Sequence, residues 1–203
     1  MGFFQALPFL LSLLLITSSA DQTFPSGRHQ RGQKPHKPDD HSLKMLCMSS
    51  TFPEACCDSL RPFAYAVQSS RQKLVDVSLS VSVKAACSTS DFLKHCQQKY
   101  GGGPLKDCIT TVADSVDRLK QSLRELKRLI RDGSDHAKFH LQNIQTWASA
   151  ALTDDQTCLD GVKQGGAKAA SPVLRAKVKV SITKVAELTS NALYFINKFN
   201  VTS

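Results

Sequence analysis

Long amphipathic stretches constrain the fold of this chain more than any other feature. Between residues 105 and 131, apolar side chains recur at steps of three and four residues, at Ile109, Val112, Val116, Leu119, Leu123, Leu126, Leu129 and Ile130. This spacing places them on one face of an α-helix, which other elements must cover. Asp132-Gly133 ends this helix. A similar stripe follows Ser171 and the first-turn proline Pro172, at Leu174, Val178, Ile182, Val185, Leu188, Ala192, Ile196 and Phe199.

Two further segments are needed to cover these faces. We expect a helix from about Lys138 to Leu152, after which Thr153 or Asp154 would cap another helix that ends at Gly161 or at Gly165-Gly166. The segment 71–98 is ambiguous. Its local pattern slightly favours a β-strand, because Val75, Val77, Leu79, Val81 and Val83 alternate with polar residues. A helical stripe is also available, through Leu74, Val77, Val81 and Ala85.

A bundle of four helices is the simplest arrangement that buries every apolar face, if 71–98 is also helical. The chain would then be one all-α domain over residues 42–203. Glycines 101–103 and Pro104 break the chain, and no Gly-Lys-Ser/Thr follows them as a phosphate-binding loop requires.

Residues 1–20 have the features of a secretory signal. An apolar run from Phe9 to Ile16 is followed by the small residues Ser18, Ser19 and Ala20. The run is too short to span a bilayer, so we expect no membrane anchor. The sequence therefore predicts a secreted protein that begins after Ala20.

The segment 21–41 is rich in proline, glycine, histidine and cationic residues, and has too little apolar surface to fold alone. We interpret it as a flexible basic arm. The formal net charge of +9 favours partners such as acidic polysaccharides or acidic protein faces, and a secreted protein is not expected to bind nucleic acid. His29, His36 and His41 are too loosely spaced to predict a metal site.

The cysteines become disulfide candidates if the chain is secreted. All of them follow the signal segment: Cys47, Cys56, Cys57, Cys87, Cys96, Cys108 and Cys158. Because seven is an odd number, at least one is free or pairs with another molecule. The segment from Cys47 to Cys57, with Phe52-Pro53 at its centre, suggests a short loop held by a disulfide.

Nothing in the sequence indicates catalysis. The motifs of zinc proteases, serine hydrolases and dinucleotide-binding enzymes are absent. Asp154 and Asp155 stand at an expected helix start, where acidic side chains complement the helix dipole. Cys87, His95 and Cys96 could suggest a thiol nucleophile, but no cleft or orienting partner is indicated. We therefore expect neither an enzyme nor a cofactor.

Four segments carry a more specific pattern, and their order matters as much as their content. They are Cys47 to Cys56 with Phe52-Pro53 between and Leu60 after; Leu105-Lys106-Asp107-Cys108 with Asp114 to Leu119; Gln145 to Thr153 with Cys158, Asp160 and Gly161; and Leu188 to Leu193. Together, over roughly Leu43 to Phe199, they resemble the plant invertase and pectin methylesterase inhibitors.

The resemblance implies a fold and a disulfide pattern. The fold is an up-down four-helix bundle with a small N-terminal helical hairpin, so on these grounds we expect 71–98 to be helical. The implied disulfides are Cys47–Cys56 and Cys108–Cys158. Cys87–Cys96 remains a candidate third bond, but nine residues of unbroken helix rise about 13 Å, too far for a disulfide. That bond therefore requires a break near residues 88–90.

The resemblance also implies a target. Inhibitors of acid invertase resemble one another in a Pro-Lys-Phe motif, where this chain has Ala137-Lys138-Phe139. The run Gln145-Thr146-Trp147-Ala148-Ser149-Ala150-Ala151-Leu152-Thr153 is typical of the other branch. We therefore favour inhibition of a pectin methylesterase over inhibition of a cell-wall or vacuolar invertase. The third alternative is a helical wall-binding protein that inhibits no enzyme.

The implied mechanism is steric: the helices cover the substrate cleft of the esterase in a one-to-one complex in the apoplast. We expect the contacts on the polar faces of the helices over 107–119 and 143–153. The candidate contact residues are Thr111, Asp114, Ser115, Arg118, Gln142, Gln145 and Thr146. The basic arm is a candidate for binding acidic pectin, and Asn200 begins a glycosylation sequon, Asn200-Val201-Thr202.

Overall fold

The computed structural model describes residues 40–100, 105–132, 136–163 and 171–199. Within these residues the regular elements are helices and there is no strand. They are α1 (Asp40–Met48), α2 (Pro53–Leu60), the 3₁₀ turn η1 (Arg61–Phe63), α3 (Ala64–Ser69), α4 (Arg71–Tyr100), α5 (Lys106–Asp132), α6 (Ala137–Lys163) and α7 (Pro172–Asn197). The expected all-α fold is therefore confirmed.

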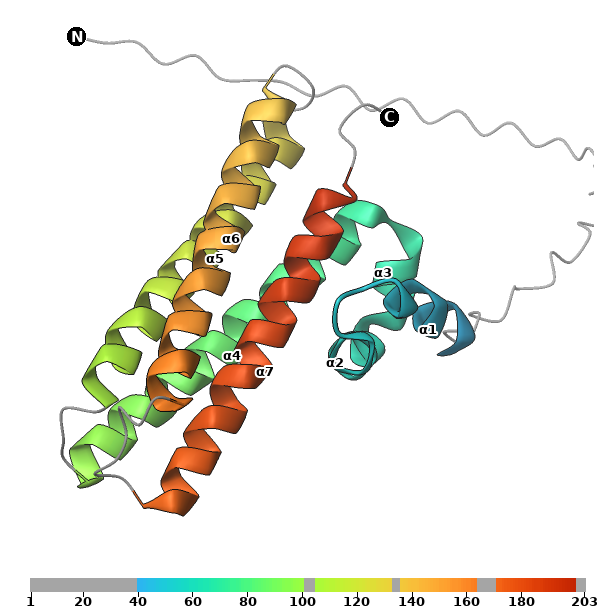
Figure 1. Cartoon of the computed structure of the whole chain (residues 1–203). Helices are drawn as coiled ribbons and strands as arrows, with labels where there is room; N and C mark the ends of the chain where they lie inside the picture. The colour runs from blue at the N-terminus through green and yellow to red at the C-terminus, as the bar shows by residue number, and fades with distance from the viewer. Residues whose placement is uncertain (1–39, 101–104, 133–135, 164–170, 200–203) are drawn as a thin grey trace, which may run out of the picture. The chain divides into compact units, whose positions relative to one another are not determined.

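The four long helices form the expected bundle (Figure 1). α5 packs against α6, α6 against α7, α7 against α4, and α4 against α5, so each long helix has two neighbours. The α5–α6 pair thus lies on the opposite side of the bundle from the α4–α7 pair. The stripes of α5 and α7 point inward, with Val112, Leu119 and Leu126 of α5 and Val178, Ile182 and Ile196 of α7 fully buried.

α4 is one unbroken helix, so the strand-like alternation in 71–98 misleads. Two serines on the polar side of that alternation are buried. The Ser78 hydroxyl donates to the carbonyl of Leu74 at 2.7 Å, and the Ser82 hydroxyl donates to that of Ser78 at 2.9 Å. Because these hydroxyls are satisfied within the helix, they can face the core without an unpaired polar group.

The continuity of α4 also excludes the candidate third disulfide, Cys87–Cys96. Cys87 and Cys96 both lie on this helix and are not bonded to each other. The helix does not break at residues 88–90, so the geometric condition for a Cys87–Cys96 bond is not met. That prediction is wrong. Cys57 also takes part in neither of the two disulfides that the structure contains, Cys47–Cys56 and Cys108–Cys158.

α6 corrects a second expectation, because it continues without a break from Ala137 to Lys163. Thr153 does not cap a new helix. Its hydroxyl donates to the carbonyl of Ser149 at 3.2 Å, and that of Thr157 donates to the carbonyl of Thr153 at 2.8 Å. These bonds occupy the side chains inside the helix. The expected first-turn proline of the last helix is confirmed, since α7 begins at Pro172, and the Ser171 hydroxyl before it caps the helix by accepting from the backbone N–H of Leu174 at 3.2 Å.

One buried side chain of α7 forms hydrogen bonds to the N-terminal hairpin of α1 and α2. Asn191 accepts from the backbone N–H of Phe52 and donates to the Phe52 carbonyl, both at 2.9 Å. Phe52 lies in the loop between α1 and α2, which the Cys47–Cys56 disulfide closes. A single amide group thus satisfies both polar groups of one loop residue and fixes the loop against the bundle.

We expect Asn191→Ala to lower the free energy of unfolding by about 2 kcal/mol, because it removes the acceptor of the Phe52 N–H and one of the two hydrogen bonds to the Phe52 carbonyl, which also accepts from the backbone N–H of Cys56. Denaturant unfolding would measure the loss. Asn197→Ala is the matched control, since Asn197 is exposed near the end of the same helix and should change stability by less than about 0.5 kcal/mol. Equal effects of the two changes would contradict this account of the hairpin.

Several sequence predictions lie outside the described residues. They are the signal segment 1–20, nearly all of the arm 21–41, and Asn200. Helix α1 begins at Asp40, inside the stretch 21–41 that the sequence analysis assigned to the arm. None of the described helices is both long and apolar enough to cross a membrane.

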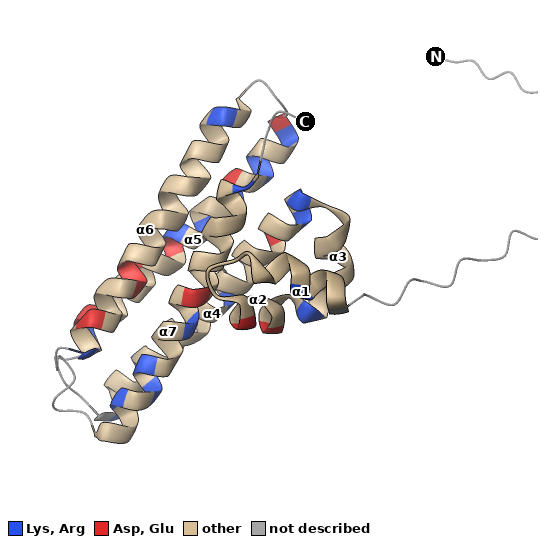
Figure 2. Cartoon of the chain, turned by 45° about the vertical axis from the view of Figure 1, so that its right-hand side comes forward, with Lys and Arg blue, Asp and Glu red and all other residues tan. Residues whose placement is uncertain are grey.

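Charged residues are distributed unevenly over the long helices (Figure 2). The first half of α6 has one charged residue, Lys138, before Asp154, whereas the first half of α7 has Arg175, Lys177, Lys179 and Lys184 and no acidic residue. The α6 surface near Gln145 is therefore polar and uncharged, and the start of α7 is strongly basic.

Candidate functional site

The α5–α6 pair, which carries the predicted contact residues, is held together at three levels along its length. At one end Cys108 and Cys158 form a disulfide with their Cα atoms 4.6 Å apart. In the middle, the buried Ser122 hydroxyl donates to the carbonyl of Ile144 at 3.2 Å. At the other end lies a polar network around Glu125. Because these links join two antiparallel helices, the surface they share is rigid.

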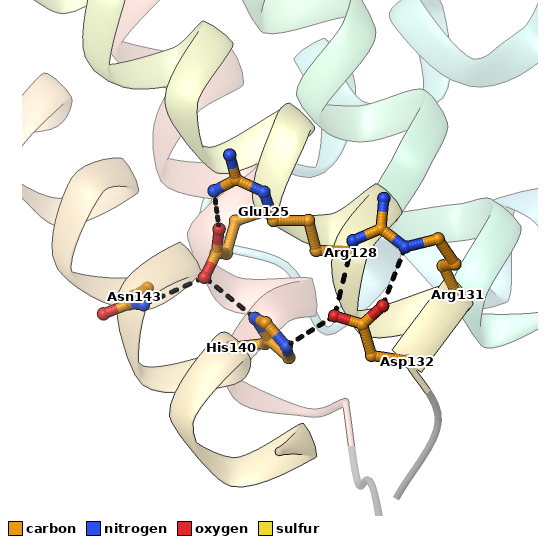
Figure 3. Close-up of polar contacts among 6 residues, drawn as sticks. All are labelled: Glu125, Arg128, Arg131, Asp132, His140 and Asn143. Atoms are coloured by element: carbon orange, nitrogen blue, oxygen red, sulfur yellow. Dashed lines mark hydrogen bonds and ion pairs between the residues drawn. The ribbon is translucent and has the colours of Figure 1, made fainter. Parts of the chain in front are cut away.

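Glu125 is buried and satisfied by three partners (Figure 3). Arg128 donates to one carboxylate oxygen at 2.7 Å, while Asn143 donates to the other at 2.9 Å and the His140 Nδ1 atom lies 2.9 Å from it. Burial alone would raise the pKa of Glu125. The hydrogen bonds from Asn143, His140 and Arg128 outweigh burial and lower this pKa to about 2. Glu125 is therefore a carboxylate over the physiological range.

His140 extends the network to the last residue of α5. Its Nε2 atom lies 3.3 Å from an oxygen of Asp132, which is also paired with the Nε atom of Arg131 at 2.8 Å (Figure 3). The hydrogen bond from Arg131 holds the pKa of Asp132 below its usual value. The network thus joins the last turns of α5 to the first turn of α6.

The contact candidates on α5 lie beside one ion pair. The Nε atom of Arg118 donates to an oxygen of Asp154 on α6 at 2.7 Å. Burial raises the pKa of Asp154, the positive charge of Arg118 opposes this increase, and the negative charge of Asp114 adds to it. Asp114 and Arg118 therefore both face Asp154. Thr111 lies one turn before Asp114 on the same side of α5.

The candidates on α6 occupy a different place. Gln145 and Thr146 line a shallow cavity of about 580 Å³ between α6 and α7, together with Ser149, Ala150, Thr153, Leu193 and Asn197. Gln142 is exposed one turn before Thr146. The structure therefore divides the predicted contact residues into an α5 group beside Asp154 and an α6 group that faces α7.

Ser115 was predicted to contact the target, and this prediction is wrong. Its exposed fraction is 0%, so no partner can reach it. It instead lies in a polar group at the centre of the bundle. There the Thr189 hydroxyl of α7 donates to a carboxyl oxygen of Asp155 of α6 at 3.1 Å. Ser115 acts on the same carboxyl from α5.

Asp155 is the most perturbed acidic group of this polar layer. Its exposed fraction is also 0%. Burial raises the pKa of Asp155 to about 7 and the adjacent Asp154 adds to the increase, while the hydroxyls of Ser115 and Thr189 act in the opposite direction. The cause is the cost of ionising a carboxyl group away from water.

Sequence reasoning missed the roles of Asp155 and Glu125, although a signal exists for each. Asp155 falls on the inward stripe of α6, which runs through Ala148, Ala151, Asp155, Cys158, Leu159 and Val162. Glu125 falls likewise beside Leu126 and Leu129 on the inward face of α5. An acidic residue on an apolar stripe predicts a buried carboxyl, and the interpretation of Asp155 as a helix-start residue overlooked this.

The described residues contain no group of three or more histidine, cysteine, aspartate or glutamate side chains that could hold a metal ion. The carboxyl groups of Glu125 and Asp155, whose pKa values are shifted most, are both buried, and neither lines the cavity of Gln145 and Thr146. The α5–α6 surface presents exposed hydrogen-bonding and charged groups on two rigidly linked helices, as a protein-binding face requires.

Comparison with known proteins gives a consistent result. The model of the family described as plant invertase/pectin methylesterase inhibitor matches residues 41–195. Pectinesterase inhibitor 11 of Arabidopsis thaliana is 32% identical over 203 residues, covering 97% of this chain and 96% of that protein. Pectinesterase inhibitor 3 of the same plant is 36% identical, covering 77% and 78%. A crystal structure of a pectin methylesterase inhibitor from Arabidopsis thaliana has the same fold, with a TM-score of 0.53, 18% identity and coverage of 80% and 98%.

Proposed function

The chain belongs to the plant invertase/pectin methylesterase inhibitor family, whose members are inhibitors rather than enzymes, and from this we propose that it inhibits a pectin methylesterase. The similarity to pectinesterase inhibitors 3 and 11, over most of each chain, is the observation that carries the proposal. The protein binds the esterase one to one and covers its substrate cleft, so that methylated pectin cannot enter.

The α5–α6 surface is the contact face in this proposal. The disulfide and the Glu125 network hold its two helices in fixed positions, which reduces the entropy lost on binding. Asp114 represents the exposed α5 group, and Thr146 represents the α6 group, which lies on the side of α6 that faces α7. The mechanism needs no chemistry from the inhibitor, since occupying the cleft is sufficient.

The proposal also places the protein in the plant cell wall. The apolar segment 1–20 directs secretion, and the oxidising compartment beyond it allows the Cys47–Cys56 and Cys108–Cys158 disulfides to form. The basic arm 21–41 supplies an additional attraction to acidic pectin, which weakens as salt rises because the charges are exposed.

The identity of the target is tested by assaying the purified, oxidised protein against a plant pectin methylesterase and a cell-wall invertase in parallel. We expect inhibition of the esterase alone. Inhibition of the invertase alone would contradict the proposal and indicate that the exposed Phe139, beside Lys138 at the start of α6, directs binding. Inhibition of neither would leave a family member whose role is to bind the wall.

The contact face is tested by charge reversal. We expect Asp114→Arg to weaken inhibition of the esterase at least tenfold, or about 1.4 kcal/mol, because an exposed acid at the centre of the α5 group becomes a large cation. We also expect Thr146→Arg, which tests the α6 group, to weaken inhibition of the esterase. Asp91→Arg is the matched control, since Asp91 is an exposed acid on α4. If Asp91→Arg weakens inhibition as much as the other two, the α5–α6 surface is not the contact face.

A further inference from the structure

The exposed face of α5 changes the sign of its charge once along the helix. The exposed residues that follow one another at steps of three and four are Asp107, Thr110, Asp114, Asp117, Lys120, Arg124, Lys127 and Arg131. This spacing keeps them on one side of the helix. The acids come first and the cations follow, so the first half of the exposed face is acidic and the second half is basic.

The charged residues of α6 have the opposite order along its own sequence. Lys138 lies in its first turn, and its acids, which include Asp154 and Asp160, all lie in its second half (Figure 2). Because the two helices are antiparallel, the disulfide joins the first half of α5 to the second half of α6, and the Glu125 network joins the other two halves. The acids of both helices therefore gather at the disulfide end of the pair, and the basic half of α5 lies at the Glu125 end.

The stability of the helices does not explain this segregation. A helix dipole favours acids at the start of a helix and cations at its end, but only within the first and last turns. Asp117 and Lys120 lie in the middle of the 27-residue α5, and α6 has the reverse of the order that its dipole favours. Like charges four residues apart, such as Lys120 and Arg124, destabilise a helix. The pattern therefore indicates a role outside the helix pair.

The cations at the Glu125 end are available to a partner. Lys120, Arg124 and Lys127 form no ion pair within the described part of the chain. The acids of this end, Glu125 and Asp132, are already paired with other arginines of α5. Nothing on these two helices therefore neutralises the three cations.

The disulfide end keeps an excess of acid. Its cations Arg118 and Lys163 are paired with acids of α6 at 2.7 and 3.1 Å, and Lys106 offsets one further acid. Asp114 and Asp117 are exposed and form no ion pair with any described residue. Each end of the α5–α6 surface thus presents unpaired charge of one sign.

We infer that the target esterase presents an acidic surface to Lys120, Arg124 and Lys127, and a basic surface to the disulfide end. Because the α5–α6 surface is the contact face only under the proposed function, this partner surface rests on that function. Asp114 and Lys127 are about 20 Å apart by helix rise, more than twice the screening length of about 8 Å at physiological ionic strength. The two ends therefore attract separate parts of the esterase surface.

This polarity fixes the orientation of the inhibitor and provides a basis for choosing among esterases. Opposite charges accelerate the encounter of two proteins, whereas like charges placed together disfavour it. An inhibitor turned end to end on the same esterase would place like charges together. An esterase that is basic where α5 is basic would be rejected in the same way.

Two double variants with the same change in net charge test the inference. Lys120→Glu with Lys127→Glu reverses two exposed charges on α5. Lys177→Glu with Lys184→Glu is the matched control, because these lysines are exposed at the same spacing on α7, outside the α5–α6 surface. The association rate constant is measured at several ionic strengths, with a plant pectin methylesterase that the wild type inhibits, and thermal unfolding is measured on the same preparations.

We expect the α5 pair to lower the association rate constant at least tenfold at low ionic strength, and the α7 pair to lower it less than twofold. The loss from the α5 pair should shrink as salt rises, because salt screens exposed charges. The α5 pair should unfold at nearly the same temperature as the wild type, since each substitution places a carboxylate four residues before an arginine, Arg124 or Arg131.

Equal losses from the two pairs would show that only net charge matters, and would overturn the inference. Unchanged or faster association in the α5 pair would also overturn it, because the esterase surface there would be neutral or basic. Both results would leave the proposed function intact, since the wild type still inhibits. If the wild type inhibits no esterase, the proposed function is wrong and the inference fails with it.

Discussion

Asp155→Asn is expected to make the protein more stable than the wild type at and above pH 7, by up to about 4 kcal/mol, and to change its stability by less than about 1 kcal/mol near pH 4. The asparagine has nearly the same volume as the buried aspartate, and its amide oxygen can accept the hydrogen bond from Thr189. What the substitution removes is the cost of ionising a carboxyl group at the centre of the bundle.

The direction of this pH dependence follows from the pKa of Asp155 in the folded protein and in the unfolded chain. The pKa is about 7 in the folded protein, against 3.8 as the reference for the unfolded chain. Below pH 3.8 the carboxyl is protonated in both states. Between pH 3.8 and 7 the unfolded chain loses the proton while the folded protein keeps it, so the free energy of unfolding falls as pH rises. The difference of about three pKa units corresponds to about 4 kcal/mol.

Glu125 has the opposite effect on stability, because the free energy of unfolding that it contributes is lost at low pH rather than at high pH. Its pKa is lowered from 4.5 to about 2, so its contribution is complete above about pH 4.5 and is lost as pH falls toward 2. Together the two carboxyl groups predict maximal stability in mildly acidic solution. Denaturant unfolding of wild type and Asp155→Asn at several pH values would measure this. A constant difference between them at all pH values would contradict the assignment.

Replacing Cys108 and Cys158 by alanine is expected to lower the free energy of unfolding by about 4 kcal/mol. Their disulfide closes a loop with a sequence separation of 50 residues, and a cross-link of this size restricts the unfolded chain strongly. The two side chains are also buried in the core near Leu93 and Leu105, so the substitution leaves space behind.

The other disulfide provides the control. Cys47–Cys56 closes a separation of only 9 residues, for which the same chain-entropy relation gives about 2.6 kcal/mol. Thermal and denaturant unfolding of the two double variants would therefore rank Cys108–Cys158 as the stronger stabiliser. The opposite order would indicate that attachment of the hairpin, rather than the link between α5 and α6, dominates the stability of the protein.

The bundle could be predicted because its helices have regular apolar stripes. The stripe that ends at Leu129 and the one that begins at Leu174 are buried where the spacing places them. The segment 71–98 could not be assigned from its local pattern, because serine can be buried in a helix by bonding to the preceding turn, as Ser78 and Ser82 do. The helix over 71–98 was predicted from the resemblance to a family and not from the periodicity of its residues.

The candidate site was harder to predict than the fold. A polar residue on a helix carries no local signal of whether it faces solvent or a neighbouring helix. Asp114 is exposed and Thr111 partly exposed on α5, while Ser115, one residue after Asp114, is buried beside Asp155 inside the bundle. Partners such as Asp154 for Arg118, or Asn191 for Phe52, are 36 and 139 residues apart, so only the packed structure brings them together.

Titration of a plant pectin methylesterase with the oxidised mature protein, over a range of pectin concentrations, tests the central claim most directly. Blockage of the cleft in a one-to-one complex predicts that tight-binding titrations end at one equivalent of inhibitor. It also predicts that added pectin relieves inhibition, so that the apparent KM rises while kcat stays constant. Undiminished esterase activity at excess inhibitor, or a fall in kcat that pectin does not relieve, would contradict it.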